Sequence, residues 1–184
     1  MKKMLSLAAI CCLFSLAAFA QKSPDFSGTW NLDSSKSQLG ERSRVESMTL
    51  TVTQTGKDLT VATATTRQAP PADSAQTSGG GRGFGGSRGF GGGDSTVAYS
   101  LDGKETTVEI DGPNGKIPVK YKAAIEGGKA KLSSSRSFKG PMGEISIDTK
   151  ETWSLSPDGK TLTIAREQTT PRGTNSSTLV FVKK

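Results

Sequence analysis

Short segments in which apolar and polar residues alternate, separated by glycine-containing turns, constrain this chain most strongly. In Val45–Gln54, for example, Met48, Leu50 and Val52 share one face and threonines occupy the other. Such a period of two is typical of strands with one buried face, and valine and threonine favour strands. The pattern predicts strands over Phe26–Leu32, Val45–Gln54, Leu59–Thr66, Thr96–Leu101, Glu105–Ile110, Ile117–Glu126, Lys129–Phe138, Glu144–Leu155, Thr161–Gln168 and Ser177–Val182.

The connections between these segments predict how the strands pair. Asp102-Gly103-Lys104, Gly127-Gly128-Lys129, Asn114-Gly115 and Asp158-Gly159-Lys160 are tight-turn sequences that join antiparallel neighbours. A long meander tends to close on itself, because open sheet edges invite aggregation. We therefore expect an all-β fold: a closed or nearly closed antiparallel up-and-down barrel of about eight to ten strands.

The N-terminal segment has the features of a cleavable signal peptide. A positive start precedes the apolar run Leu5–Phe19, which ends in the small-x-small sequence Ala18-Phe19-Ala20. The run is shorter than the roughly 20 apolar residues that span a bilayer. We expect residues 1–20 to be removed after Ala20. The mature domain is then 21–184, periplasmic or extracellular, with no transmembrane segment.

Composition excludes several kinds of chemistry. The chain has no histidine, and its two cysteines, Cys11 and Cys12, lie within the expected signal peptide. Ser-His-Asp catalysis and Cys/His zinc sites are therefore excluded in the mature chain. Calcium-loop, phosphate-loop and Gly-x-Ser-x-Gly motifs are missing from the sequence as well. We expect no metal, no cofactor and no catalytic residue, with an enzyme working through Glu151 or another carboxylate as the alternative.

A glycine-rich insert, residues 68–94, interrupts the strand pattern. It contains the near-copies Arg82-Gly83-Phe84-Gly85-Gly86 and Arg88-Gly89-Phe90-Gly91-Gly92. Glycine this dense cannot build a core, so we expect a flexible loop between two strands. A tolerated insertion is the favoured interpretation, and a loop over a barrel mouth or against another surface is the alternative. Two arginine–phenylalanine repeats are too few to indicate nucleic-acid binding in an exported protein.

The sequence also resembles a family. Gly28-Thr29-Trp30 on the first strand, then Ser35-Lys36-Ser37 and the recurrent Asp-Gly-Lys turns, resemble small secreted bacterial lipocalin-like (calycin-type) barrel proteins of unknown function. The resemblance covers nearly the whole mature chain except the insert. It implies that Trp30 closes one end of the barrel and packs on an arginine from a late strand, with Arg166 and Arg172 as candidates. Gly28 and Trp30 are thus expected to be structural.

The Asp158-Gly159 turn fixes a register that brings polar residues inward. A two-residue turn pairs Leu155 with Leu162, Trp153 with Ile164, and Glu151 with Arg166, which keeps both apolar sets on one face. Other inward rows add tyrosines and a second arginine. The candidate ligand-binding residues are Tyr99, Tyr121, Arg136, Glu151, Trp153 and Arg166.

Two functions suit such an interior. Apolar walls with a few convergent polar groups are typical of a ligand pocket, here for a small hydrophobic or amphipathic molecule whose acidic head would meet Arg136 or Arg166. Alternatively, Glu151 and Arg166 neutralise each other as a buried pair. The barrel would then be filled by side chains and would act as an interaction module for a protein or an envelope component.

Overall fold

The computed structural model describes residues 23–40, 43–68, 94–112, 115–140 and 143–184. The expected signal peptide, residues 1–20, lies outside these ranges, as does the insert between Gln68 and Asp94. Export and the flexibility of the insert therefore stay predictions. No helix within the described ranges is long and apolar enough to cross a membrane.

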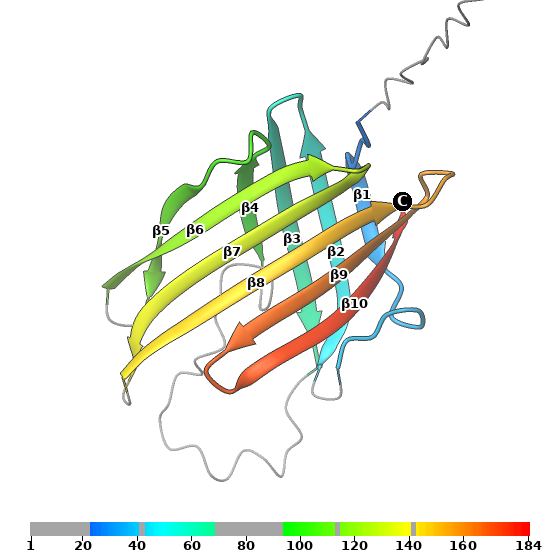
Figure 1. Ribbon diagram of the computed structural model, residues 1–184. Helices are drawn as coiled ribbons and strands as arrows, with labels where there is room; N and C mark the ends of the chain where they lie inside the picture. The colour runs from blue at the N-terminus through cyan, green and yellow to red at the C-terminus, as the bar shows by residue number, and fades with distance from the viewer. Residues whose placement is uncertain (1–22, 41–42, 69–93, 113–114, 141–142) are drawn as a thin grey trace, which may run out of the picture.

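The described chain folds into ten strands (Figure 1), one for each segment that the sequence indicates. Observed ends differ from the expected ones by a few residues, mainly because the hairpins of the second half extend further. The strands are β1 Gly28–Leu32, β2 Val45–Gln54, β3 Asp58–Arg67, β4 Ser95–Ser100, β5 Thr106–Gly112, β6 Gly115–Glu126, β7 Lys129–Gly140, β8 Gly143–Leu155, β9 Thr161–Thr170 and β10 Gly173–Lys183.

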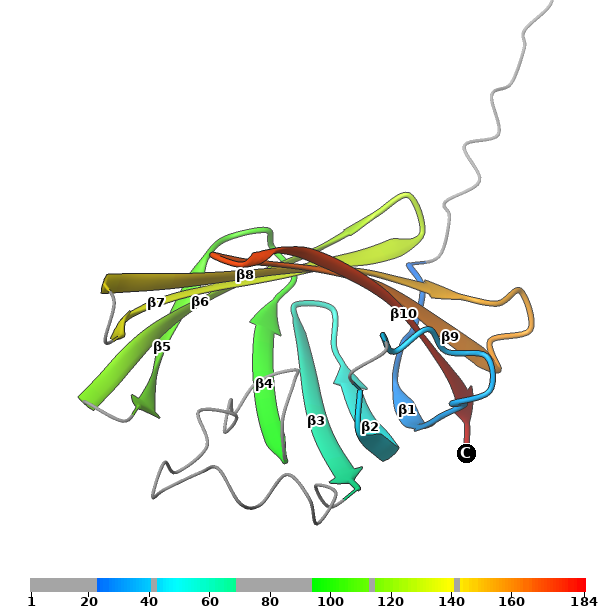
Figure 2. The ribbon, with the colours of Figure 1, turned by 90° about the horizontal axis from the view of Figure 1, so that it is seen from below.

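All ten strands belong to one antiparallel sheet in the order β4-β3-β2-β1-β10-β9-β8-β7-β6-β5. Because β1 pairs with both β2 and β10, the chain ends meet inside the sheet, and β4 and β5 become its two edges. The sheet curls so that β2–β4 face β6–β9 (Figure 2). A bridge between Asp102 and Ala124 ties the β4 side to β6. The result is the predicted lipocalin-like, nearly closed up-and-down barrel.

The register predicted from the Asp158-Gly159 turn is confirmed, but the connection is longer than the two residues expected: β8 ends at Leu155, β9 begins at Thr161, and the Gly159 amide donates to the Ser156 carbonyl oxygen at 2.9 Å. Glu151 pairs with Arg166, Trp153 with Ile164, and Leu155 with Leu162. Gly159 adopts φ +68°, which the turn requires, and Asp158 Oδ1 accepts a hydrogen bond from the Lys160 amide at 3.0 Å. Local turn chemistry therefore sets the face to which every side chain of β8 and β9 points.

The apolar core fills one end of the barrel, where β8 ends and β9 begins; we call this the closed end. Phe26 and Trp153 pack edge to face with ring centroids 6.0 Å apart. Trp30 Nε1 donates a hydrogen bond to the Phe26 carbonyl oxygen at 2.9 Å. The largest fully buried side chains are Trp30, Trp153, Phe26, Phe181, Leu50, Leu59, Leu162, Ile164 and Val61.

Trp30 is buried as expected, but the cation over its ring is a lysine. Lys183 Nζ lies 5.1 Å from the Trp30 ring centroid, and the two residues are paired across β1 and β10. Arg172 lies in the turn at the other end of β10, and Arg166 forms an ion pair with Glu151. Neither candidate therefore takes the place of Lys183.

Gly28 makes room for this lysine. A Cβ at Gly28 would lie 2.7 Å from Lys183 Cε, and the φ of +134° disfavours any side chain. We expect Gly28→Ala to lower the free energy of unfolding by about 1–2 kcal/mol, through backbone strain and loss of the cation–π contact. Urea unfolding measures the change. Gly103→Ala is the control, since Gly103 has φ +75° and open space around it. An equal loss in both variants would contradict a role for the lysine contact.

Candidate ligand site inside the barrel

A buried ionic network lies next to the apolar core, on the inward face of β8 and β9. Arg166 Nε donates to Glu151 Oε1 at 2.6 Å, and Trp153 Nε1 donates to Glu151 Oε2 at 2.9 Å. The side chains of Arg166 and Glu151 are only 13% and 3% exposed. Both carboxylate oxygens therefore have a donor, and the buried negative charge has an opposite charge beside it. Three of the six predicted site residues thus come together and satisfy one another.

Little space remains beside this network. The cavity next to Glu151 has a volume of about 10 Å³ and is lined by Tyr99, Leu132, Ser133, Ser134, Thr149 and Glu151. Such a volume is close to the minimum for a single water molecule. A ligand larger than water does not fit there without movement of side chains, so the region around Glu151 is a structural layer in this conformation.

The two tyrosines form the next contact across the barrel. Tyr99 on β4 and Tyr121 on β6 pack edge to face, with centroids 5.4 Å apart. Burial raises the pKa of Tyr99 well above its ordinary value, and the negative charge of Glu151 adds to the rise. Burial also raises the pKa of Tyr121, whereas the charge of Arg136 lowers it. Both hydroxyls are therefore neutral donors or acceptors at physiological pH.

Arg136 occupies a different environment from Arg166. It lies on β7 between Val119 of β6 and Ile147 of β8, on the inward face of the sheet. It is partly buried, and this burial lowers its pKa because the charged form loses water. Among the described residues, no carboxylate lies within ion-pair distance of it. A desolvated guanidinium without an anion attracts one strongly.

Beyond the buried Val119, the inward rows next to Arg136 contain apolar side chains that are only partly covered. Toward the end of the barrel where β6 begins and β7 ends, which we call the open end, β6–β8 project beyond β4 (Figure 2). Val108, which pairs with Val119, is 45% exposed although it belongs to an inward row. The other members of this open-end wall, all half-buried, are Ile110, Ile117, Phe138, Ile145 and Ile147.

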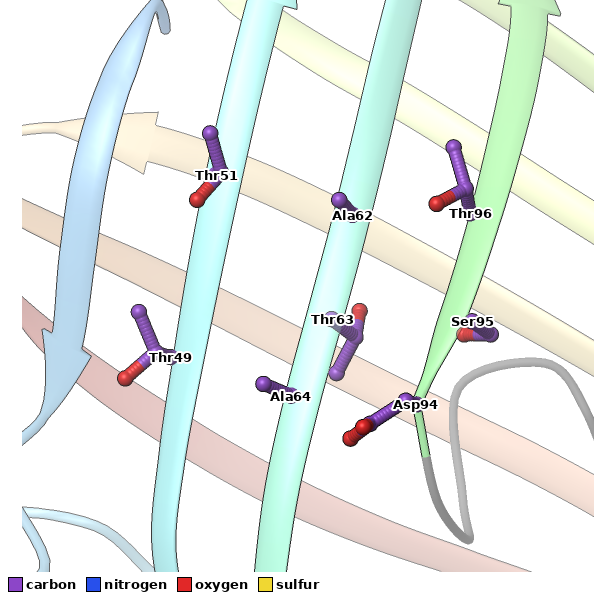
Figure 3. A pocket seen from close by; sticks show the side chains of 8 residues that line it. All are labelled: Thr49, Thr51, Ala62, Thr63, Ala64, Asp94, Ser95 and Thr96. Carbon is purple, nitrogen blue, oxygen red and sulfur yellow. The ribbon is translucent and has the colours of Figure 1, made fainter.

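A second hollow lies along β2, β3 and β4 (Figure 3). It has a volume of about 390 Å³ and is lined by Thr49, Thr51, Ala62, Thr63, Ala64, Asp94, Ser95 and Thr96. Most of these residues alternate with inward ones such as Leu50 and Val61, so they belong to the outer face. Its sides carry hydroxyl groups and the carboxylate of Asp94, and the alanines of β3 lie between them. In the sequence, the outward threonines of β2 and β4 indicate only the solvent-exposed face of a strand and give no signal of a site.

The structure therefore divides the predicted site residues into two groups, with Tyr99 between them, packed on Tyr121. Glu151, Trp153 and Arg166 form the internal network, while Arg136 lies further toward the open end with Tyr121 beside it. Their role in ligand binding stays a prediction. In the described ranges no group of three or more His, Cys, Asp or Glu side chains could hold a metal ion.

The fold is a small, nearly closed antiparallel barrel of ten strands in the described part of the chain. No protein-family model and no curated protein matches the chain. Among solved structures, the crystal structure of zebrafish ileal bile acid-binding protein complexed with cholic acid is similar, with a TM-score of 0.48 and 18% sequence identity. The match covers 86% of this chain and 98% of that chain. A likeness of this size carries no information about function.

Proposed function

We propose that this protein is an exported, non-catalytic binding protein for an amphipathic anion. The anionic head binds Arg136, and the apolar body lies along the open-end wall of β5–β8. The observation that carries the proposal is the partly buried Arg136 guanidinium, which has no carboxylate partner in the described part of the chain. Arg166, the other candidate for the head group, is neutralised by Glu151.

The surroundings of Arg136 support an amphipathic ligand over a small inorganic anion. Val119 and Ile147 pair with Arg136 on the neighbouring strands; Val119 is buried, Ile147 is half-buried, and Val108 exposes 45% of its surface. Covering such apolar area contributes roughly 25 cal/mol per Å². A charged head combined with a hydrocarbon body uses both features of the wall, whereas phosphate or sulfate would use only the charge.

A comparison of head groups tests this proposal. Protein produced from the full chain is titrated by calorimetry with oleate, oleyl alcohol and oleylamine, which share one hydrocarbon chain. We expect oleate to bind about ten-fold or more tighter than the alcohol, because a charge-assisted hydrogen bond contributes about 1.5–3 kcal/mol, and the amine to bind least. Equal binding of all three probes would contradict a specific anion site, and failure of all three to bind would contradict the ligand function.

The alternative function is an interaction module that acts through its outer surface. The observation in its favour is the packed closed end, where the cavity beside Glu151 measures only about 10 Å³. In that case the titrations with all three lipids show no heat of binding, and the hollow along β2–β4 becomes the first surface to mutate.

A further inference from the structure

Two hydroxyl groups in the barrel wall are buried without a hydrogen-bond partner. They are Thr63 Oγ1 on β3 and Ser95 Oγ on β4. The two residues are directly opposite each other in the antiparallel ladder, and Thr63 is only 5% exposed. A buried hydroxyl that gives up water and gains no partner destabilises the fold. Two such groups side by side therefore need a physical explanation.

The position of the pair relates it to the ligand site. Along β3, Thr63 follows the buried Leu59 and Val61 on the same inward row, one step further toward the open end. Arg136 likewise follows Ala130 and Leu132 along β7. Strands β3 and β4 form the wall that faces β7 and β8 (Figures 1 and 2). The hydroxyls and the guanidinium thus lie on opposing walls, with Thr63 paired to the buried Leu50 and Arg136 paired to the buried Val119.

We propose that Thr63 and Ser95 are specificity-determining residues that hydrogen-bond a polar substituent, such as a hydroxyl, within the apolar body of the ligand. This inference rests on the proposed function. The site then selects a hydroxylated amphipathic anion over one with a plain hydrocarbon body. A plain chain leaves both protein hydroxyls unpaired, while a ligand hydroxyl can donate to one and accept from the other.

Matched probes test the inference. The full-length protein is titrated with stearate and with a panel of hydroxystearates that carry the hydroxyl at successive chain positions. We expect at least one hydroxystearate to bind about ten-fold tighter than stearate, which corresponds to about 1.4 kcal/mol for one recovered hydrogen-bond pair. In the double variant Thr63→Val/Ser95→Ala, the ratio should fall below about two-fold, with stearate affinity retained.

A stability measurement separates recognition from a structural role. Replacing Thr63 by valine removes an unsatisfied buried hydroxyl and keeps the side-chain shape, so the urea midpoint of Thr63→Val should rise. Thr60→Val is the matched control. Thr60 lies on the same strand, alternates with the inward row and pairs with Ala98. Thr60→Val should leave the preference for hydroxystearate intact.

Each outcome is decisive. Loss of the preference together with a higher midpoint supports the pair as a recognition element. Equal binding of stearate and every hydroxystearate by the unmodified protein overturns this inference and leaves the proposed anion function standing. A preference that survives in the double variant also overturns it. If the protein binds none of the probes, the proposed function fails, and this inference fails with it.

Discussion

Glu151→Ala is expected to lower the free energy of unfolding by about 3–5 kcal/mol, the usual cost of breaking a buried ion pair by removing one partner. The substitution leaves the guanidinium of Arg166, whose side chain is 13% exposed, without its acceptor at 2.6 Å. It also removes the acceptor of the Trp153 indole N–H, a buried hydrogen bond of 2.9 Å. Urea unfolding followed by tryptophan fluorescence measures the loss.

An exposed ion pair provides the control for this variant. Lys131 and Glu126 are also 2.6 Å apart, but their side chains are 58% and 59% exposed. Glu126→Ala should cost less than about 1 kcal/mol, because water replaces the lost partner. The double variant Glu151→Leu/Arg166→Met should recover most of the stability lost in Glu151→Ala, since apolar replacements leave no buried charge. Similar losses in Glu151→Ala and Glu126→Ala would contradict the buried network.

Arg136→Gln is expected to weaken oleate binding by about 10- to 100-fold, because a neutral amide cannot replace a charge-assisted hydrogen bond to a carboxylate. Affinity for oleyl alcohol should hardly change. Stability should change little or increase, since the guanidinium is partly desolvated without a carboxylate beside it among the described residues. Calorimetry on both lipids and urea unfolding provide the three readouts.

Two further variants define the role of Arg136. Arg136→Lys keeps the charge and loses the planar two-nitrogen donor, so oleate affinity should fall between those of the original protein and Arg136→Gln. Lys122→Gln removes a positive charge from the exposed face of β6 and should leave oleate binding unchanged. An equal effect of Lys122→Gln and Arg136→Gln would indicate general electrostatic attraction in place of a site.

Much of the fold follows from local sequence. Alternation located every strand, and the Asp158-Gly159 turn predicted the pairing of Glu151 with Arg166, because a hairpin centred on these residues leaves one register that buries both apolar rows. The inward placement of Tyr99, Tyr121 and Arg136 follows from the same period. The register and the inward placement depend only on neighbouring strands, because the turn and the alternation of side chains determine them.

Contacts between distant strands could not be predicted in this way. The contact of Lys183 with the Trp30 ring requires β10 to pair with β1. The alternation of side chains along a strand does not tell which cation of a late strand reaches that ring. The difference between Arg136 and Arg166 depends on where the opposing wall ends, because β6–β8 extend beyond β4 (Figure 2). The unpartnered hydroxyls of Thr63 and Ser95 appear in sequence as ordinary strand residues.

A crystal structure of the protein with oleate would decide whether Arg136 binds an anionic head group inside the barrel. The proposed function predicts one oleate inside the barrel, its carboxylate about 3 Å from the Arg136 guanidinium nitrogens and its chain against Val108, Val119 and Ile147. An interior without lipid, or oleate bound only in the outer hollow beside Thr51 and Thr96, would contradict the proposed function.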